Sequence, residues 1–544
     1  MIGMKDPGEL LSKLSVLEPS KETIDTLIAL VREAFQKIQL LEDEIAILKN
    51  QKPRPKIEPS KLEKTDKTNN AEGIKKNWTK GSKNQKLVID KEEKIEVPAN
   101  QIPHGSTFKG YKEFVVQELV IIKQATRYLL AQWEKPDGTY IAAKPPEATG
   151  GGHFGPGLQQ YILHQHHANR VPQNRIQTDL NDKGIAISEG QVENILKEAG
   201  ARFQLEKESL LPAGLQAESS QADDTGARHK GKNGVATVIC NKFFSYFKSS
   251  NTKSRINFLE ILCSGNIEYT ITQEMLDYIK DYKLAPSTLN IIEQLLGSRF
   301  ATCTSNHFGI CETWKTFLQK HCFGKTTQRI LTEGALIGTL ITRETVTLET
   351  IFMSDGAGQF ALLKHVLCWI HIERSIKRLI PLNEQDRVER DQVLDHFWTF
   401  YRELKAYKAS TPEERDALKL RLSYRFDEIF SFRATEAPLA QALKKIRDHK
   451  SELMLVLEHP DIPLHNNASE NDIREYVTKR KISGGTRSDE GRDARDTFTS
   501  LYKTCKKLGI SFWDYLTDRI NKVGKIPFLA ELIRKKIKLA AAGP

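Results

Sequence analysis

Three acidic residues stand at positions where proteins often place catalytic carboxylates. Asp223 lies in a polar extended stretch (QADDTGARHKGKNG), Asp355 directly follows a hydrophobic run (FMSDGAGQF), and Glu470 stands near the start of a helical segment (LHNNASENDIREYV). Carboxylate oxygens suit Mg²⁺ or Mn²⁺, and two such ions about 3.5–4 Å apart can activate the attacking oxygen and stabilise the leaving oxygen in phosphoryl transfer. The three residues therefore predict a site for two divalent ions that needs no nucleophilic side chain.

Each carboxylate also has a purely structural interpretation. Asp355 before Gly356 could form a turn, and Asp223 with Asp224 could be an exposed pair in a turn. Glu470 follows Asn467 by three residues, which is the spacing of a capping box. No single residue of the three decides between structure and chemistry.

A strip of basic residues follows Glu470. Arg474 comes one helical turn later, on the same face as the carboxylate. Around the pair Gly484-Gly485 the chain then carries Lys479, Arg480, Lys481, Arg487, Arg492 and Arg495. Cations beside a metal site would hold the phosphates that flank a scissile bond. The alternative is a solvated basic loop.

Length and composition limit the class of protein. The chain has 544 residues, enough for three or four domains, and a net charge of +11, which indicates a polyanionic partner, either nucleic acid or a membrane surface. Its 7 cysteines are an odd number scattered over a long chain, which favours free thiols. No stretch reaches the ~20 apolar residues of a membrane span, and the first residues lack the apolar region of a signal peptide. We therefore expect a cytoplasmic, nucleoid-associated protein.

The N-terminal region carries the clearest periodic pattern. Apolar residues alternate spacings of three and four at Ile24, Leu27, Val31, Ala34, Ile38, Leu41, Ile45 and Leu48. This pattern predicts a coiled coil within residues 1–50 and a homo-oligomer; a helix folded back on its own chain is the alternative. Residues 51–105 are rich in Lys, Pro and Asn and predict a flexible basic linker.

Two small regions precede the carboxylates. Residues 106–150 contain β-rich runs at 114–122, 126–134 and 139–143, which predict a small antiparallel sheet. Residues 151–210 predict helices joined by a turn at Gly184, with Ser188 as the cap of the later helix, as in a helix-turn-helix. Gln191 and Lys197 would then face DNA. A helical hairpin without a binding role is the alternative.

Residues 211–520 predict one catalytic domain. A hairpin is expected from 234–240 and 243–249, with further strands at 347–354 and 365–369. Long helical patterns at about 256–345 and 380–460 read as insertions, and 521–544 as a basic C-terminal helix or tail. The fold class is therefore multidomain α/β (α+β). A carboxylate on one strand, one after another strand and one on a helix is the arrangement of a ribonuclease-H-like mixed sheet.

Four sequence strings, in order, resemble the transposases of the insertion sequence 66 family: ADDTGARHKGKNG, SDGAGQF, CWIHIER and HNNASENDIREYVTKRKISGGTRSDEGRDARDTF. The resemblance covers roughly residues 106–520. It implies a DDE transposase that uses two Mg²⁺ or Mn²⁺ ions to cut the ends of an insertion sequence and to transfer the 3′-hydroxyl strand into target DNA. The family's catalytic residues fall on Asp223, Asp355 and Glu470, although the first could be Asp224. Small accessory proteins of the same element are implied partners.

The chain departs from this family in its cysteines. Many relatives carry a zinc-binding segment before the helix-turn-helix, but residues 51–239 contain no cysteine. Cys368 and His371 form a single Cys-x-x-His pair with no convincing second pair, so no zinc is expected. We expect Cys368, His371 and Arg374 to support the core behind the carboxylates. The histidines His164, His166 and His167 are expected on a helix surface.

Two rival functions remain at this point. One is a non-catalytic DNA-binding protein derived from a transposase, which an intact acidic set argues against. The other is a structure-specific nuclease of the same fold. Strand-transfer products would distinguish a transposase from a nuclease, because a nuclease yields hydrolysis alone.

Overall fold

The computed structural model describes residues 89–146, 152–299, 307–308 and 311–541. The predicted coiled coil (1–50) and most of the predicted linker lie outside these residues. The chain divides into two compact units, residues 1–120 and 121–544, and all elements below except one short helix belong to the second unit. No helix in the described part of the chain is long and apolar enough to span a membrane.

The region before residue 146 contains little regular structure. The first unit holds a short 3₁₀ helix, η2 (Ala99–Gln101), and the second unit begins with the hairpin of β1 (Gln132–Glu134) and β2 (Tyr140–Ala142). The hairpin turn is held by Asp137, whose Oδ1 accepts the Thr139 N–H at 2.9 Å. The prediction of a strand at 114–122 is wrong. Its apolar pattern suits a strand, but Phe114 is 89% exposed, and a strand does not persist without a neighbour to pair with.

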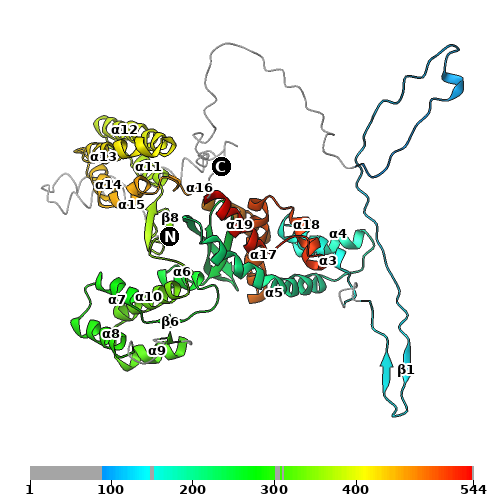
Figure 1. Ribbon diagram of the computed structural model, residues 1–544, viewed down its shortest axis with the longest axis horizontal. Coiled ribbons are helices and arrows are strands. Elements are labelled where there is room, and N and C mark those ends of the chain that lie inside the picture. The colour runs from blue at the N-terminus through cyan, green and yellow to red at the C-terminus, as the bar shows by residue number, and fades with distance from the viewer. Residues whose placement is uncertain (1–88, 147–151, 300–306, 309–310, 542–544) are drawn as a thin grey trace, which may run out of the picture. The chain divides into compact units, whose positions relative to one another are not determined.

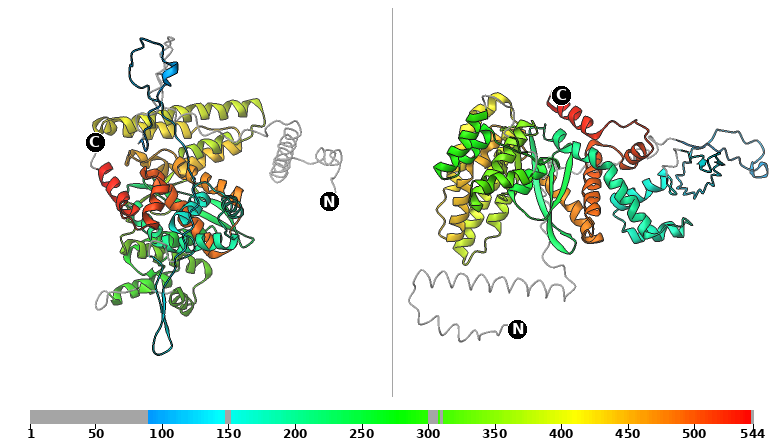
Figure 2. Two further views of the ribbon diagram at one scale, coloured as in Figure 1. Left: turned by 90° about the vertical axis from the view of Figure 1, so that its right-hand side faces the viewer. Right: turned by 90° about the horizontal axis from the view of Figure 1, so that it is seen from below.

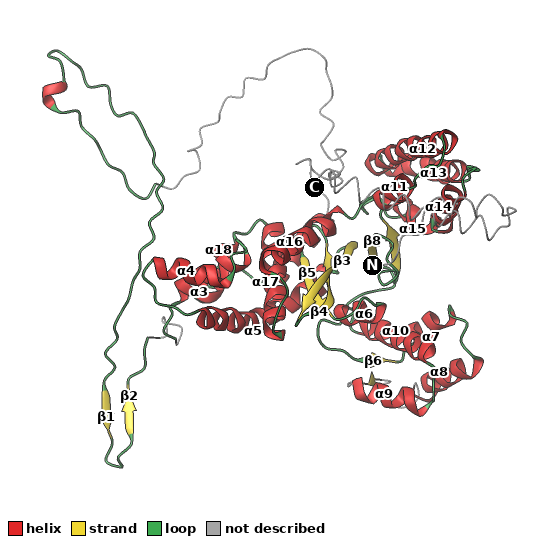
Figure 3. Cartoon of the chain, turned by 180° about the vertical axis from the view of Figure 1, so that it is seen from behind, coloured by secondary structure: helices red, strands yellow, loops and turns green. Residues whose placement is uncertain are grey.

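A mixed five-stranded sheet forms the centre of the second unit (Figure 3). Its spatial order is β5-β4-β3-β8-β9, in which β5, β4 and β3 run antiparallel and β8 and β9 continue parallel to β3. The strands are β3 (Ser219–His229), β4 (Lys232–Cys240), β5 (Ser245–Ser250), β8 (Ile351–Ser354) and β9 (Lys364–Leu367). The predicted hairpin and both predicted later strands are therefore present, which confirms a mixed α/β fold.

Two helices pack against this part of the sheet, the first on β3 and β4 and the second along the free edge of β5. They are α16 (Asn467–Ser483) and α17 (Asp489–Leu508). The N–H groups of Phe247 and Ser249 on β5 donate to Ser500 Oγ at 2.8 Å and to Asp496 Oδ2 at 2.6 Å on α17. Side chains thus satisfy the free edge of β5, which would otherwise expose unpaired donors.

Three helices precede the sheet: α3 (Pro156–His167), α4 (Gln173–Asp182) and α5 (Glu189–Gly214). Gly184 makes the turn between α4 and α5 with φ +76°, a conformation that favours glycine. Ser188 then caps α5 by accepting the Gln191 N–H at 3.2 Å. Ile162, Ile176 and Val192 from the three helices are fully or almost fully buried in one core.

Two helical insertions extend from the sheet (Figures 1 and 2). The first contains α6 (Arg255–Leu262), β6 (Tyr269–Thr270), α7 (Gln273–Lys280), α8 (Pro286–Arg299), β7 (His307–Phe308), α9 (Cys311–Lys320) and α10 (Lys325–Thr342). The second contains α11 (Trp369–Lys377), α12 (Glu384–Ala409), α13 (Pro412–Phe430), α14 (Ala437–Asp448), α15 (Lys450–Met454) and the 3₁₀ helix η4 (Leu455–Leu457). The second insertion has its own aromatic core, in which Trp369 packs among Phe397, Phe400 and Phe426.

Two further helices end the described chain. They are α18 (Phe512–Ile520) and α19 (Leu529–Ala541). Arg519 of α18 binds Glu206 of α5 through Nε at 2.8 Å, and the Leu529 N–H donates to the same carboxylate at 3.2 Å. The basic C-terminal segment is therefore anchored to α5 rather than left as a tail.

Candidate active site

The sheet register places Asp223 and Asp355 at the same level. Gln221 of β3 pairs in parallel with Met353 of β8. Each aspartate lies two residues beyond its member of this pair, so parallel strands carry both toward the same end of the sheet. Asp223 is half-buried, while Asp355 is exposed directly after β8.

Gln221 also fixes the start of α16, which carries Glu470. Its Oε1 accepts the Ser469 N–H at 3.1 Å, and its Nε2 donates to the His465 carbonyl at 3.1 Å. Both contacts join positions more than two hundred residues apart along the chain, and Glu470 follows Ser469 directly. One side chain on β3 therefore positions the helix that brings the third carboxylate to the sheet.

Glu470 does not form a capping box. The cap residue of α16 is Asn466, which makes no side-chain cap bond, and Glu470 occupies the fourth helical position. Its N–H already bonds the Asn466 carbonyl at 3.1 Å. The capping interpretation of Glu470 is therefore wrong, and its carboxylate is available to the site.

The electrostatics of Asp223 tie the three carboxylates together. The pKa of Asp223 is raised to about 7, chiefly by burial and in smaller part by the negative charges of Asp355, Asp224 and Glu470, while the hydrogen bond from the Asp224 N–H at 2.7 Å opposes the shift. Like charges raise a carboxyl pKa only when they lie close enough to repel it. Asp355 and Glu470 thus act on Asp223 although they are far away in sequence.

Arg374 and His371 of α11 contact Glu470. Arg374 Nη1 donates to Glu470 Oε1 at 2.8 Å, and His371 Nε2 lies 3.6 Å from the same oxygen. Burial lowers the pKa of His371, opposed by Glu470 and assisted by Arg374. His371 and Arg374, predicted to support the core, therefore contact the Glu470 carboxylate itself.

Cys368 supports the site from its buried position at the start of α11. Its Sγ accepts the Asn466 N–H at 3.4 Å, and the Trp369 N–H donates to the Leu464 carbonyl at 3.0 Å. Burial raises the pKa of Cys368 to about 11, so it remains a thiol at neutral pH. These contacts hold the start of α11 against the start of α16.

Asp355 lies in a turn that also leaves its carboxylate exposed. Its Oδ1 accepts the Ala357 N–H at 3.0 Å, and Gly356 adopts φ +93°. The turn interpretation of Asp355 is therefore correct, and it does not exclude a second role. Behind the turn, Ser354 Oγ bonds His365 Nε2 at 2.8 Å, and His365 Nδ1 bonds Glu452 at 2.7 Å. Sequence patterns did not reveal these linked hydrogen bonds, because the residues that form them lie far apart in the sequence.

Asp224 has its own partners. Its Oδ2 accepts from Gln359 Nε2 at 2.6 Å, and Lys253 Nζ lies 3.0 Å from its Oδ1. Successive strand residues point to opposite faces of a sheet, so Asp224 and Asp223 face different surroundings. Asp224 is balanced by a cation, whereas Asp223 is surrounded by like charge. This contrast favours Asp223 as the first carboxylate of the site.

The donor types suit a hard divalent cation. The charges of Asp355 and Glu470 act on Asp223, and a bound cation would relieve this repulsion. Across the described ranges, however, no three His, Cys, Asp or Glu side chains already stand in a metal-binding arrangement. The ion pair with Arg374 gives the physical reason on the Glu470 side, since this carboxylate is turned toward a guanidinium.

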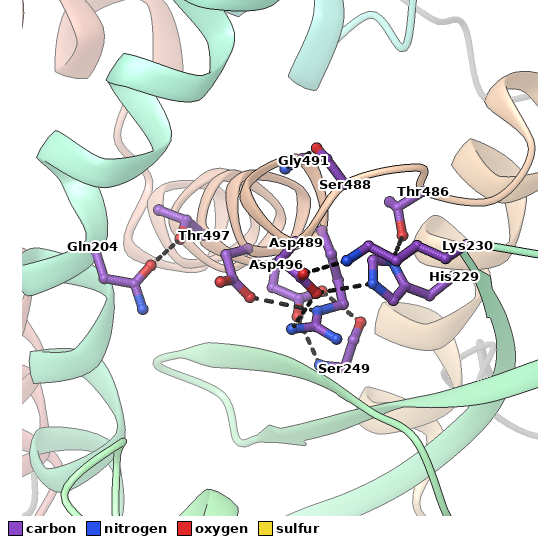
Figure 4. Close-up of polar contacts among 12 residues, drawn as sticks. Gln204, His229, Lys230, Ser249, Thr486, Ser488, Asp489, Gly491, Asp496 and Thr497 are labelled. Carbon is purple, nitrogen blue, oxygen red and sulfur yellow. Dashed lines mark hydrogen bonds and ion pairs between the residues drawn. The ribbon is translucent and has the colours of Figure 1, made fainter. Parts of the chain in front are cut away.

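The loop from Gly484 to Ser488, which carries Arg487, is anchored to the β3–β4 turn (Figure 4). The Thr486 N–H donates to the Arg228 carbonyl at 2.9 Å, and His229 bonds Thr486 Oγ1 and Asp489, each at 2.9 Å. A Cβ at Gly485 would lie 2.6 Å from the Arg228 carbonyl oxygen, so glycine permits this close approach. The loop is therefore held in place next to the sheet that carries Asp223.

The basic residues predicted to bind DNA differ in exposure. Arg474, Lys481 and Arg487 are exposed. Arg480 is half-buried, with Nη1 3.5 Å from Thr225 Oγ1, and Arg492 is half-buried near Asp489 at 3.3 Å. Arg495 is buried and donates to the Gly484 carbonyl at 3.0 Å.

The prediction that Lys479 binds DNA is wrong. Only 4% of it is exposed, and its Nζ donates to the His166 carbonyl at 2.9 Å. Burial, together with the charges of Arg495 and Arg170, lowers its pKa far below the ordinary value. An amine buried in this way cannot reach a DNA phosphate.

The expected surface position of the histidines on α3 is also wrong for two of them. Burial lowers the pKa of His166 and of His167 well below the ordinary value, with Lys479 adding to the effect. The His167 ring stacks on Phe498 of α17 at a centroid distance of 4.2 Å. The His167 ring therefore packs α3 against α17, while the half-buried His166 contacts the Val171 carbonyl through Nδ1 at 2.9 Å.

The two residues predicted to face DNA from α5 lie on its first turns. Gln191 is half-buried, and its N–H binds the Ser188 cap. Lys197 pairs with Glu193 at 2.8 Å, one turn earlier on the helix. The pairing reduces the net charge that this face offers to a phosphate.

Comparisons with known proteins agree with this geometry. A family model described as "Transposase IS66 family" matches residues 151–263 and 335–494, which include all three carboxylates. The chain is 40% identical over 329 residues to "Uncharacterized protein y4jO" of Sinorhizobium fredii (strain NBRC 101917 / NGR234), covering 60% of this chain and 100% of that protein. No solved structure matches the chain.

Proposed function

The chain belongs to the IS66 family of transposases, and we propose that it is a DDE transposase that cuts the ends of an insertion sequence and joins the freed 3′-hydroxyl to target DNA. The observation that carries this proposal is the mutual influence of Asp223, Asp355 and Glu470. Three carboxylates that repel one another at one end of a sheet form a typical functional site, because such repulsion is costly unless a ligand relieves it.

The topology supports a ribonuclease-H-like core. Three antiparallel strands are followed by two parallel ones, and the carboxylates come from β3, from the end of β8 and from α16. The family match is interrupted between residues 263 and 335, within the first helical insertion. The chemistry shared with the family would then lie in the sheet, with the insertion as an addition of its own.

Asp223, Asp355 and Glu470 would hold the divalent cations. When bound, such ions supply Lewis-acid stabilisation of the attacking and leaving oxygens of a phosphodiester. The protein's own residues do the positioning: Gln221 sets the start of α16, and Arg374 and His371 orient the Glu470 carboxylate. Arg374 also keeps a positive charge beside Glu470 when no cation is bound.

DNA would lie along the exposed cations that follow Glu470. Arg474, Lys481 and Arg487 are exposed on α16 and its following loop, close in sequence to the carboxylate. Phosphate contacts of this kind position DNA without reading its sequence. We expect α4 and α5, as a helix-turn-helix within residues 151–210, to recognise the sequence of the element ends, with Gln191 and Lys197 toward the bases. The N-terminal coiled coil would pair two protomers, one for each end.

The test compares wild-type protein with Asp355→Asn on duplexes that carry the element ends, in the presence of Mg²⁺. The wild type should nick these ends and give strand-transfer products. Asp355→Asn should reduce both by more than about a hundredfold, because loss of a residue that merely orients a metal ligand already costs 10–100-fold. Asp355 is exposed, so the substitution should not disturb folding.

Asp395→Asn is the matched control, since it removes an exposed aspartate from α12 outside the site. It should leave both activities unchanged. Hydrolysis without strand transfer would assign a nuclease. No nicking by the wild type, or equal nicking by Asp355→Asn, would favour a non-catalytic DNA-binding protein.

A further inference from the structure

A pocket of about 480 Å³ lies between the first helical insertion and the loop after β8. Its lining includes Lys253, Arg255, Tyr282, Arg329, Glu333 and Gln359. Tyr282, Arg329 and Glu333 belong to the part of the insertion that the family model does not match, whereas the others lie in matched segments. The pocket therefore combines the sheet region shared with the family and an addition of this chain.

The pocket has a positive lining. Glu333 is 1% exposed and is bound by Arg329 Nη1 at 2.8 Å, with Arg255 Nη1 at 3.6 Å. Lys253 is the third cation of the lining and pairs with Asp224 at 3.0 Å, so three positive charges stand against two carboxylates. The side chains of Lys253 and Arg329 are each 47% exposed and can still reach a guest. The charge and the exposure favour an anion.

Arg255 gives the pocket a rigid wall. It donates to the Tyr282 hydroxyl at 2.9 Å and to the Gly358 carbonyl at 2.8 Å. These bonds join the insertion to the loop that begins at Asp355. Tyr282 is half-buried in the lining and contributes an aromatic ring.

The pocket lies beside the loop that begins at Asp355, one of the proposed catalytic carboxylates. Gln359 lines it and donates to Asp224, the neighbour of Asp223, at 2.6 Å. Gly358 and Gln359 follow Asp355 in the same short loop. A DNA strand that passes the carboxylates would therefore meet this pocket next.

We propose that the pocket binds one unpaired nucleotide of the DNA strand beside the cut, with its phosphates against Lys253 and Arg329 and its base against Tyr282. The volume is that of a site for a small molecule, about 300–1,000 Å³, so a nucleotide fits. Aromatic rings together with cations are the usual means of holding single-stranded DNA. This inference rests on the proposed function, because it takes DNA as the substrate.

The test measures binding of a fluorescein-labelled, mixed-sequence single strand in EDTA, at several salt concentrations. Lys253→Gln with Arg329→Gln should weaken binding and lower the slope of log affinity against log salt by about 0.7 for each phosphate that is no longer neutralised. Glutamine at 329 still offers a donor to Glu333, so folding is preserved. Lys325→Gln removes an exposed charge from the same helix, α10, outside the pocket, and should change neither quantity.

A second pair of measurements tests the base contact. Tyr282→Leu should weaken binding of the normal strand about tenfold, the range expected when one stacked base is removed from its ring. It should leave binding of an abasic strand unchanged. Competition by free deoxynucleoside monophosphate at the same concentration as the strand would assign the pocket to free nucleotides and overturn the proposal.

The proposal is also overturned if Lys325→Gln weakens binding as much as the pocket variants, or if the pocket variants bind as the wild type does. Its outcome is separate from that of the catalytic proposal, because EDTA prevents metal-dependent cleavage. If DNA is cleaved normally and the pocket variants bind the single strand as the wild type does, only the pocket proposal is wrong. If the wild type does not cleave DNA but the pocket variants bind the single strand more weakly, the pocket proposal stands and the catalytic assignment is wrong.

Discussion

Two buried carboxylates near the central sheet, Asp472 and Asp223, have opposite surroundings. Asp472 of α16 accepts from Ser245 Oγ at 2.6 Å and pairs with Lys503 at 2.9 Å and Lys507 at 2.6 Å. Burial opposes its charge, yet the two lysines lower its pKa below the ordinary value. Asp223 instead faces other carboxylates, and its pKa is raised to about 7.

This difference separates a structural carboxylate from a functional one. The fold offsets the burial of Asp472 with cations from α17 and leaves Asp223 without such compensation. Asp472 and Glu470 are two residues apart on α16, so one helix serves both regions. An acidic group that the fold leaves destabilised at one end of a sheet indicates a site that a cation completes.

Asp472→Asn should have the largest effect on stability. It leaves Lys503 and Lys507 without their buried partner, and breaking such a pair costs about 3–5 kcal/mol. The melting temperature at neutral pH should fall by several degrees, whereas Asp395→Asn should leave it unchanged. Because the pKa of Asp472 is lowered, its contribution in the wild type should disappear as the pH falls below about 4. An unchanged melting temperature would mean that the two carboxylates do not differ in the way described.

Asp223→Asn should have the opposite effect on stability, because it should stabilise the folded protein. The raised pKa means that the folded protein holds this proton more tightly than the unfolded chain, so stability is lost as the pH rises from about 4 to about 7. Without metal, the variant should melt above the wild type at about pH 8, by at most about 4 kcal/mol in stability. The difference should vanish toward pH 4. A difference that does not depend on pH would contradict the raised pKa of Asp223.

The smallest predicted effects, on the salt dependence of DNA binding, distinguish a buried basic residue from an exposed one. Lys479→Met should leave the salt dependence of duplex binding unchanged, because the amine is buried against α3 and does not reach the DNA. Arg487→Gln, which removes an exposed charge from the anchored loop, should lower the slope of log affinity against log salt by about 0.9. Equal slopes for both variants would remove the distinction.

Much of the sheet could be predicted from local patterns. The hairpin of β4 and β5, the strand that ends at Asp355 and the cap at Ser188 each depend on residues close together in sequence. The strand expected at 114–122 could not be excluded in this way, because its pattern is correct and its missing neighbour is a matter of tertiary structure.

The site was only partly predictable. The sequence predicts that Asp223, Asp355 and Glu470 are carboxylates carried on strands and a helix. It does not predict the contacts that position these elements. Gln221 holds Ser469, and His365 holds Glu452, across long stretches of chain. Lys479 was assigned to the surface because lysine is usually exposed, and packing against α3 reversed that expectation.

The most direct test of the central claim is the stabilisation of the protein by Mg²⁺, measured as a melting-temperature shift at about pH 8. A ligand that binds only the folded state stabilises it in proportion to the logarithm of its concentration over its Kd. Mg²⁺ should raise the melting temperature of the wild type and of Asp395→Asn equally, and should have little effect on Asp223→Asn, Asp355→Asn or Glu470→Gln. Equal shifts in all five proteins, or none in the wild type, would contradict a single cation site built from these three carboxylates.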